Sequence, residues 1–230
     1  MVRQVFGPQT GLAERYVALL ADTGISHGLI GPREAPRLWH RHVLNCAVVH
    51  PLFAGGADVA DVGTGAGLPG LALAIVRPDL HLHLIEPLHR RTTWLRQTVA
   101  DLELDNVTIH EGRAESLWGV RRFPYVTARA VARIDALARW CLPLLEVGGT
   151  LHALKGASAQ EELEAGRGVL TELGASRCAV ESFGRGVLDP ETMVLSVSVD
   201  ATVGGRPTRT PPGRRKGTDL GSRRPGRSPT

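Results

Sequence analysis

From Ala57 onward the chain alternates between strand-like and helix-like segments, and this alternation restricts the fold more than any other feature. Strands are predicted over 57–62, 81–86, 107–110, 125–129 and 150–155, and helices over 69–77, 89–102, 134–145 and 158–173. Strands that alternate with helices form parallel sheets with right-handed crossovers. The last two strands, 176–183 and 192–199, are joined by a loop containing Gly184, Gly186 and Pro190. We therefore predict an α/β, Rossmann-like fold with a mostly parallel seven-stranded sheet and a C-terminal antiparallel hairpin.

The first 56 residues show only helical periodicity. Apolar residues recur at helical spacing over 11–23 and again over about 37–53, before Gly55 and Gly56 interrupt the chain. We expect 1–56 to form a helical extension packed on the core and 57–200 to form the main domain.

The last 30 residues differ in composition from the rest. Of the 27 basic and 23 acidic residues, eight basic residues and one acid lie in 201–230, so that residues 1–200 carry a net charge of −3 within a total of +4. This segment is rich in Gly and Pro and has almost no apolar side chains, which predicts a disordered basic tail. Such a tail could add affinity for nucleic acid through counterion release, or it could only increase solubility.

The strongest local signal is the run Asp61-Val62-Gly63-Thr64-Gly65-Ala66-Gly67-Leu68-Pro69-Gly70. Glycines after a strand let the backbone turn sharply and approach a ligand closely. In open α/β sheets, ligands bind at the carboxyl ends of the strands. We expect the loop to hold a cofactor, with Pro69 at the first position of the helix that follows.

Two acids help to distinguish between cofactors. The spacing of Gly65, Gly67 and Gly70 also fits a dinucleotide site, but Asp61 ahead of the first glycine favours S-adenosylmethionine. Glu86 ends the second strand and is placed to bind ribose hydroxyls, which either cofactor would offer. Ala114 and Glu115 follow the third strand, where they could contact the adenine edge, although Glu115 alone could be a solvated loop acid.

The remaining composition excludes several classes of protein. Cys46, Cys141 and Cys178 are far apart and lack CxxC spacing, which argues against a disulfide framework and a zinc site. We expect no metal, no signal peptide and no membrane association, and we expect a cytoplasmic location. Cys141 and Cys178 are expected to be small buried residues and not nucleophiles. No interface signature is evident, so we expect a monomer.

Several further motifs resemble one bacterial enzyme family. Besides the glycine loop, these are Arg41-His42-Val43-Leu44, Glu86-Pro87, Arg90-Arg91, Arg113-Ala114-Glu115, Arg129-Ala130-Val131-Ala132 and Leu154-Lys155-Gly156. Over about 12–199 the chain resembles the bacterial ribosomal RNA small subunit methyltransferase G family, also called the glucose-inhibited division protein B family. The resemblance implies a class I methyltransferase fold and S-adenosyl-L-methionine-dependent methylation of guanine N7 in 16S rRNA near the decoding region. It places the cofactor at Gly63, Leu68, Ala114, Glu115 and Arg129.

The chemistry of guanine N7 agrees with the residues present. N7 carries an in-plane lone pair and no proton, so its methylation requires alignment and no general base. The product base gains positive charge, and an arginine placed against N7 would oppose the reaction. We therefore expect Arg129 to bind the methionine carboxylate, a phosphate or guanine O6, unless it only forms a surface salt bridge.

A set of basic side chains could bind the RNA. Arginine makes bidentate phosphate contacts, and Lys155 follows the carboxyl end of a strand, where it could also position the substrate. His42 could equally be a hydrogen-bonded packing residue. The candidates are Arg41, His42, Arg90, Arg91, Arg113 and Lys155.

Three other functions remain open on the sequence alone. An NAD-dependent oxidoreductase would need a substrate domain for which 230 residues leave little room. A non-enzymatic RNA-binding module would need a decayed cofactor site, whereas the glycine loop and Glu86 are intact. A methyltransferase acting on a small molecule or on another RNA could share the fold, and the fold alone does not decide.

Overall fold

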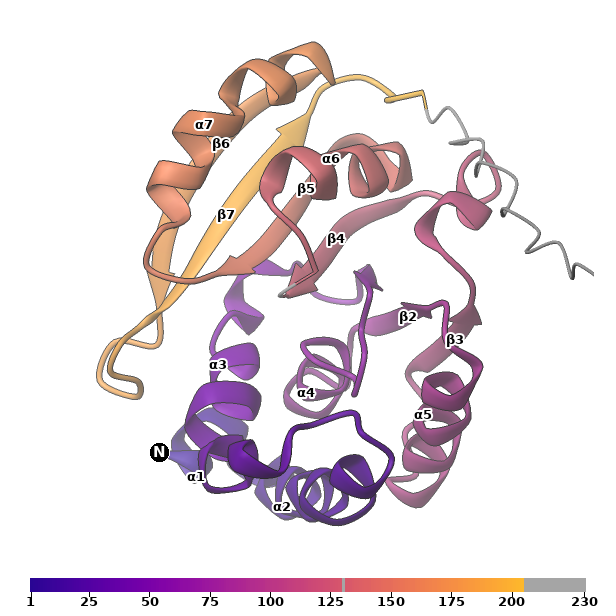
Figure 1. Ribbon diagram of the computed structural model, residues 1–230, viewed down its shortest axis with the longest axis vertical. Helices are drawn as coiled ribbons and strands as arrows, with labels where there is room; N and C mark the ends of the chain where they lie inside the picture. The colour runs from indigo at the N-terminus through magenta and orange to yellow at the C-terminus, as the bar shows by residue number, and fades with distance from the viewer. Residues whose placement is uncertain (130, 205–230) are drawn as a thin grey trace, which may run out of the picture.

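The computed structural model describes residues 1–129 and 131–204 and contains one seven-stranded sheet (Figure 1). The spatial order of the strands is β3-β2-β1-β4-β5-β7-β6. Their bounds are β1 (Asp58–Val62), β2 (His81–Glu86), β3 (Val107–Glu111), β4 (Phe123–Arg129), β5 (Leu145–Lys155), β6 (Ala175–Phe183) and β7 (Thr192–Val199).

The strand directions confirm the predicted fold class. β1 pairs in parallel with β2 and β4, β2 with β3, and β4 with β5. β7 is antiparallel to both β5 and β6, which makes β6 and β7 the expected hairpin. The order reverses at β1, whose neighbours are β2 and β4, so the glycine loop lies at the topological switch point where such sheets bind ligands.

Helices cover both faces of the sheet and create two cores. On one face, α4 (Gly70–Val76) and α5 (His89–Asp101) pack with the N-terminal helices over side chains such as Leu82 and Leu84. On the other face, α6 (Ile134–Cys141) and α7 (Ala159–Glu172) pack over side chains such as Val126 and Leu151. Figure 1 shows this three-layer arrangement, with α6 and α7 on the side away from α4 and α5. The alternation of Leu82 and Leu84 with His83 and Ile85 explains why β2 serves both cores.

The N-terminal extension is helical, but in its second half a continuous helical stretch over 38–47 ends before a separate short turn over 50–52. It comprises α1 (Val2–Phe6), η1 (Gly7–Gln9), α2 (Thr10–Leu19), η2 (Leu20–Gly24), η3 (Pro32–Arg37), η4 (Leu38–Val43), α3 (Leu44–Ala47) and η5 (His50–Leu52). The expectation of one helix over 37–53 was therefore wrong. Pro51 stands inside η5, where proline favours the start of a new turn over the continuation of a helix. Pro69 also differs from expectation, because it caps α4 and the helix begins at Gly70.

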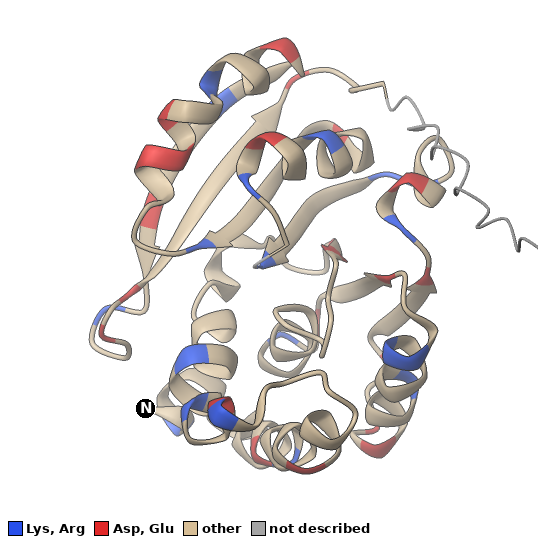
Figure 2. Cartoon of the chain, in the orientation of Figure 1, with Lys and Arg blue, Asp and Glu red and all other residues tan. Residues whose placement is uncertain are grey.

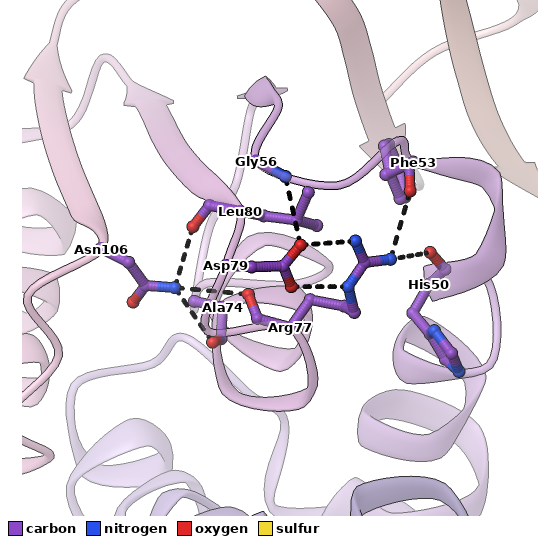
Figure 3. A network of polar contacts seen from close by, with 8 residues as sticks. All are labelled: His50, Phe53, Gly56, Ala74, Arg77, Asp79, Leu80 and Asn106. Atoms are coloured by element: carbon purple, nitrogen blue, oxygen red, sulfur yellow. Dashed lines mark hydrogen bonds and ion pairs between the residues drawn. The ribbon is translucent and has the colours of Figure 1, made fainter.

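A polar network joins the end of this extension to the turn between α4 and β2 (Figure 3). The Arg77 guanidinium donates to the carbonyl oxygens of His50 and Phe53, each at 3.2 Å, and to both oxygens of Asp79 at 2.7 Å. Asp79 also accepts from the Gly56 backbone N–H at 3.2 Å. Because the linker at 54–57 is held at both ends, the extension is fixed to the sheet where β1 begins.

Two observations concern the C-terminal part. Val203 packs against the core cluster of α6 and α7, and its carbonyl accepts from Arg122 at 3.3 Å. The ordered body thus extends past the expected boundary at residue 200, while the basic residues expected in a tail, from Arg206 onward, lie outside the described residues. Among the residues described, no helix is long and apolar enough to cross a membrane.

Candidate functional site

The glycine loop turns back on itself directly after β1. The Gly63 and Thr64 N–H groups donate to the Ile85 carbonyl at 2.9 and 3.3 Å, which extends the pairing of β1 with β2 into the loop. Gly63, Gly65 and Gly67 have φ values of 70°, 59° and 88°, a region that favours glycine. A Cβ atom on Gly63 would lie 2.9 Å from Val131 Cγ2, so any other residue at this position would force the Val131 side chain to shift.

Asp61 is a buried acid beneath this loop. Its side chain is fully buried, and Oδ2 accepts from the Gly70 N–H at 2.8 Å. Its other oxygen, Oδ1, and the nearby Thr64 hydroxyl have no hydrogen-bond partner within the described part of the chain. Burial raises the pKa of Asp61 to about 7. A buried carboxylate oxygen without a partner suits a cationic ligand group such as an ammonium.

Glu86, at the end of β2, organises the loop from the other side. Its carboxylate is 1% exposed and accepts from the Gly65 N–H at 3.1 Å through Oε2 and from the Leu88 N–H at 3.0 Å through Oε1. Arg91 lies 3.4 Å from Oε2. One carboxylate therefore holds the glycine loop, the start of α5 and a cation together at the predicted ribose site.

A small cavity of about 150 Å³ opens beside these residues. Its lining includes the predicted cofactor residues Gly63, Ala114 and Glu115, together with Ile85, Val131 and Trp140. Ala114 is buried and begins η6 (Ala114–Leu117), which presents Glu115 to the cavity. Apolar walls with one carboxylate suit a flat base such as adenine. Sequence reasoning missed Val131 and Trp140, because nothing in their spacing separated them from ordinary packing residues.

A larger groove of about 910 Å³ lies at the carboxyl ends of β4 and β5. One wall comes from the N-terminal extension and includes Arg37, His40, Arg41 and Asn45, and the other comes from the β6–β7 hairpin and includes Asp189. Arg129 and Lys155 line its floor. Arg129, the last residue of β4, lines the groove, and Val131, two residues further along the chain, lines the small cavity.

Arg129 makes its contacts with the N-terminal extension. Its Nη2 atom donates to the Arg41 carbonyl at 3.0 Å and lies 2.9 Å from His42 Nδ1, while Nη1 lies 3.6 Å from Cys46 Sγ. The guanidinium forms no ion pair with an acid in the described part of the chain, so the alternative of a surface salt bridge is not what the structure shows.

The predicted RNA contacts are not equally available. Arg41 is exposed at the groove, Arg90 is exposed on α5, and Arg113 lines the small cavity. Figure 2 shows basic positions on α5 and in the extension, whereas α7 carries mostly acidic positions.

Arg41 also lies 3.8 Å from Glu34 but stays exposed, whereas the other three candidates are more buried and have partners inside the protein. Arg91 pairs with Glu86, and His42 bonds to Glu34 at 2.8 Å. The Lys155 ammonium is only 10% exposed and donates to Glu162 and to the Ala132 carbonyl, each at 2.7 Å. Lys155 therefore fastens the loop after β4, a role that no sequence signal indicated.

The three cysteines differ in burial. Cys46 and Cys141 are buried. Burial raises the pKa of the Cys46 thiol to about 11, and it raises the pKa of the Cys141 thiol well above its ordinary value. Cys178 was also expected to be a small buried residue, but it is only partly buried where it packs against the core cluster of α6 and α7. It lies on β6, one of the two edge strands of the sheet, which has a neighbour on one side only.

Tyr16 supports the glycine loop from the N-terminal extension, a contact that the sequence did not indicate. It is fully buried on α2, and its hydroxyl donates to the Ala66 carbonyl at 2.8 Å and lies 3.2 Å from the Gly67 carbonyl. At the level of sequence, Tyr16 was only one of several apolar residues at helical spacing.

Removing the Tyr16 hydroxyl should loosen the loop. We expect Tyr16→Phe to leave the Ala66 carbonyl without its donor and to lower the free energy of unfolding by about 1–3 kcal/mol. Thermal unfolding and calorimetric titration with S-adenosylhomocysteine measure both consequences, with weaker binding expected. Unchanged stability and unchanged affinity would show that Tyr16 does not support the loop.

The comparisons with known proteins point to one family. Residues 9–191 match the family model GidB, described as rRNA small subunit methyltransferase G. A protein of that name from Thermobifida fusca is 50% identical over 220 residues, covering 93% of each chain, and one from Renibacterium salmoninarum is 53% identical over 196 residues, covering 85% of this chain and 91% of its own.

Solved structures of low sequence identity share the fold. The S-adenosylmethionine-dependent methyltransferase SibL aligns with a TM-score of 0.59 at 18% identity, over 83% of this chain and 70% of its own. The O-methyltransferase TomG from Streptomyces achromogenes, solved with S-adenosylmethionine, aligns with a TM-score of 0.53 at 15% identity, over 82% and 89%. These likenesses bear out the class I methyltransferase fold.

Proposed function

Because the chain belongs to the rRNA small subunit methyltransferase G family, we propose that it transfers a methyl group from S-adenosyl-L-methionine to guanine N7 of 16S rRNA. The observation that supports this most directly is the position of two residues near the end of β4. Val131 lines a cavity suited to an adenine base, and Arg129, two residues before it, lines a groove with several cations, as the transfer of a group from a nucleoside cofactor to a nucleic acid requires.

The residues around the glycine loop fit the cofactor. Asp61 offers a buried oxygen without a partner to the ammonium group, and Glu86 offers a carboxylate to the ribose. When bound, the cofactor supplies an electrophilic methyl group on a sulfonium. We assign its binding to Asp61, Gly63, Gly65, Gly67, Leu68, Glu86, Ala114, Glu115 and Arg129.

The protein's own contribution is alignment. Guanine N7 needs no deprotonation, so positioning supplies the catalysis, with at most roughly 7–11 kcal/mol from orientation. Arg41 and Arg113 are exposed beside the groove and the cavity and would bind RNA phosphates, with Arg90 further along α5. Arg129 is tied to the extension and would contact the methionine carboxylate, guanine O6 or a phosphate, away from N7.

The organisation of the chain follows from this assignment. Residues 1–56 form the wall of the groove that faces the acceptor, and residues 57–200 form the cofactor-binding domain. We infer that the enzyme acts as a monomer in the cytoplasm on the small ribosomal subunit or its 16S rRNA.

Methyl transfer to isolated subunits tests the proposal. Labelled S-adenosylmethionine is incubated with the enzyme and with small subunits from a strain lacking this methylation, or with naked 16S rRNA. We expect label in the RNA of at least one of the two substrates. Cofactor binding without transfer to either would indicate another methyl acceptor, and absence of cofactor binding would exclude a methyltransferase.

The raised pKa of Asp61 predicts a pH dependence of cofactor binding. A cationic ligand group favours the ionised carboxylate, so affinity should fall as the pH drops through about 7 and Asp61 becomes protonated. We expect binding at pH 6 to be about tenfold weaker than at pH 8, as one titrating group allows. In Asp61→Asn, affinity should be low at both values and the difference should vanish. Calorimetric titration at the two pH values measures this, and an equal pH dependence in the variant would contradict it.

A further inference from the structure

Three side chains from separate segments form a line that ends at the groove. Glu34 lies on η3, His42 on η4 and Arg129 at the end of β4. Glu34 Oε2 is 2.8 Å from His42 Nε2, and His42 Nδ1 is 2.9 Å from Arg129 Nη2. Both ring nitrogens of His42 are therefore engaged, and its side chain is only 13% exposed.

The donors and acceptors in this line allow one arrangement of protons. A guanidinium can only donate, so His42 Nδ1 must accept from Arg129. The ring is then neutral with its proton on Nε2, which donates to the Glu34 carboxylate. The carboxylate fixes the tautomer of the imidazole, and the imidazole fixes one edge of the guanidinium.

We propose that Glu34 and His42 are positioning residues that hold the Arg129 guanidinium at the floor of the acceptor groove. This inference rests on the proposed function and replaces the assignment of His42 as an RNA contact. The guanidinium is also held by the Arg41 carbonyl and by Cys46 Sγ, so all of these anchors come from the N-terminal extension.

Anchoring the Arg129 guanidinium keeps its positive charge away from guanine N7 during methylation. A free arginine side chain carries about 2 kcal/mol of rotamer entropy and samples many directions. Because the methylated base becomes positive, a guanidinium that moved against N7 would raise the barrier. Fixed to His42, Arg129 can offer its remaining N–H groups to O6 or to a phosphate without approaching N7.

The hydrogen bond between Arg129 and His42 Nδ1 should break only at acidic pH. The charged groups that face His42 are Glu34, Arg41 and Arg129. Burial and the two arginines lower the pKa of His42, and this outweighs the opposing effect of Glu34. Protonation would put an N–H on Nδ1 against the guanidinium and remove the acceptor. The neutral, connected state therefore persists below the ordinary histidine pKa of about 6.5 and is lost only as the pH falls further.

Matched variants separate positioning from simple packing. His42→Asn keeps an acceptor where Nδ1 lies, whereas His42→Gln carries its amide further out, so that Arg129 loses the acceptor at position 42. We expect His42→Asn to retain kcat within about fivefold, and His42→Gln and Glu34→Ala to lose at least about 20-fold, with cofactor affinity within threefold of the original. Glu172→Ala, an exposed acid on α7, serves as the control. Equal losses in both His42 variants, or full activity in His42→Gln, would overturn the proposal.

Nitrogen-15 NMR of histidine-labelled enzyme tests the line without any substrate. The His42 signals are assigned by their absence in His42→Asn. We expect a neutral ring protonated on Nε2 that titrates below pH 6.5, and an Nδ1-protonated or normally titrating ring would overturn the proposal. Since this readout needs no methyl transfer, failure of the proposed function on wild-type enzyme would be seen separately.

Discussion

Glu86→Gln is expected to weaken S-adenosylmethionine binding by about 100-fold or more. The carboxylate accepts from the Gly65 and Leu88 N–H groups through different oxygens, and an amide has only one oxygen to offer. Its NH2 group would face a backbone donor in a buried site, and Arg91 would lose its ion partner. Hydrogen bonds to charged groups contribute about 1.5–3 kcal/mol, and about 2.7 kcal/mol corresponds to 100-fold in affinity.

The neighbouring strand offers a matched control for this change. Glu111 pairs in register with Glu86 on β3, but its side chain is 36% exposed and bonds to His89, Thr92 and Arg96 on α5. Glu111→Gln should leave calorimetric binding within a few-fold of wild type. A Glu86→Gln enzyme that binds the cofactor as tightly as the Glu111→Gln enzyme would contradict the assignment of Glu86 to the ribose site.

Arg129→Ala is expected to reduce methyl transfer by at least about 100-fold. The substitution removes the donor to His42 Nδ1 and to the Arg41 carbonyl, and such losses in a partly buried site cost about 1–3 kcal/mol of stability each. The floor of the groove also loses one of its two cations, because only Lys155 remains there. Arg139→Ala, an exposed change on α6, should leave transfer unchanged.

Two measurements on Arg129→Ala distinguish its possible partners. If Arg129 binds the methionine carboxylate, calorimetric affinity for the cofactor falls together with transfer. If it binds guanine O6 or a phosphate, cofactor affinity is retained and only transfer to RNA falls. Unchanged binding and unchanged transfer would exclude Arg129 from the site.

The sheet could be predicted from the sequence because local patterns determine it. Apolar runs of strand length, the glycine turn after β1 and the loop between β6 and β7 each specify their own geometry. The extension was harder to predict because apolar spacing alone does not reveal where a helix breaks. Over 37–53 the periodicity suggested one helix, whereas the helical stretch of η4 and α3 ends at Ala47 and a separate turn, η5, contains Pro51.

The site was predictable only in part, for a physical reason. The glycine loop, Glu86 and Glu115 occupy fixed positions relative to strand ends, so their convergence follows from the fold. Tyr16, His42 and Lys155 bond to residues that are distant in the sequence. Their contacts therefore depend on how the chain folds and not on local spacing. A basic side chain looks the same in sequence whether its partner is a phosphate or a buried acid. For that reason Lys155 was expected to contact RNA, although its ammonium is paired with Glu162.

The identity of the methylated atom tests the central claim most directly. RNA from the transfer reaction on small subunits is digested to nucleosides and analysed by mass spectrometry, with the Glu86→Gln enzyme as the negative control. We predict that the label appears in 7-methylguanosine with the wild-type enzyme and is absent with the variant. Label in any other nucleoside, or none in the RNA despite tight cofactor binding, would contradict the account.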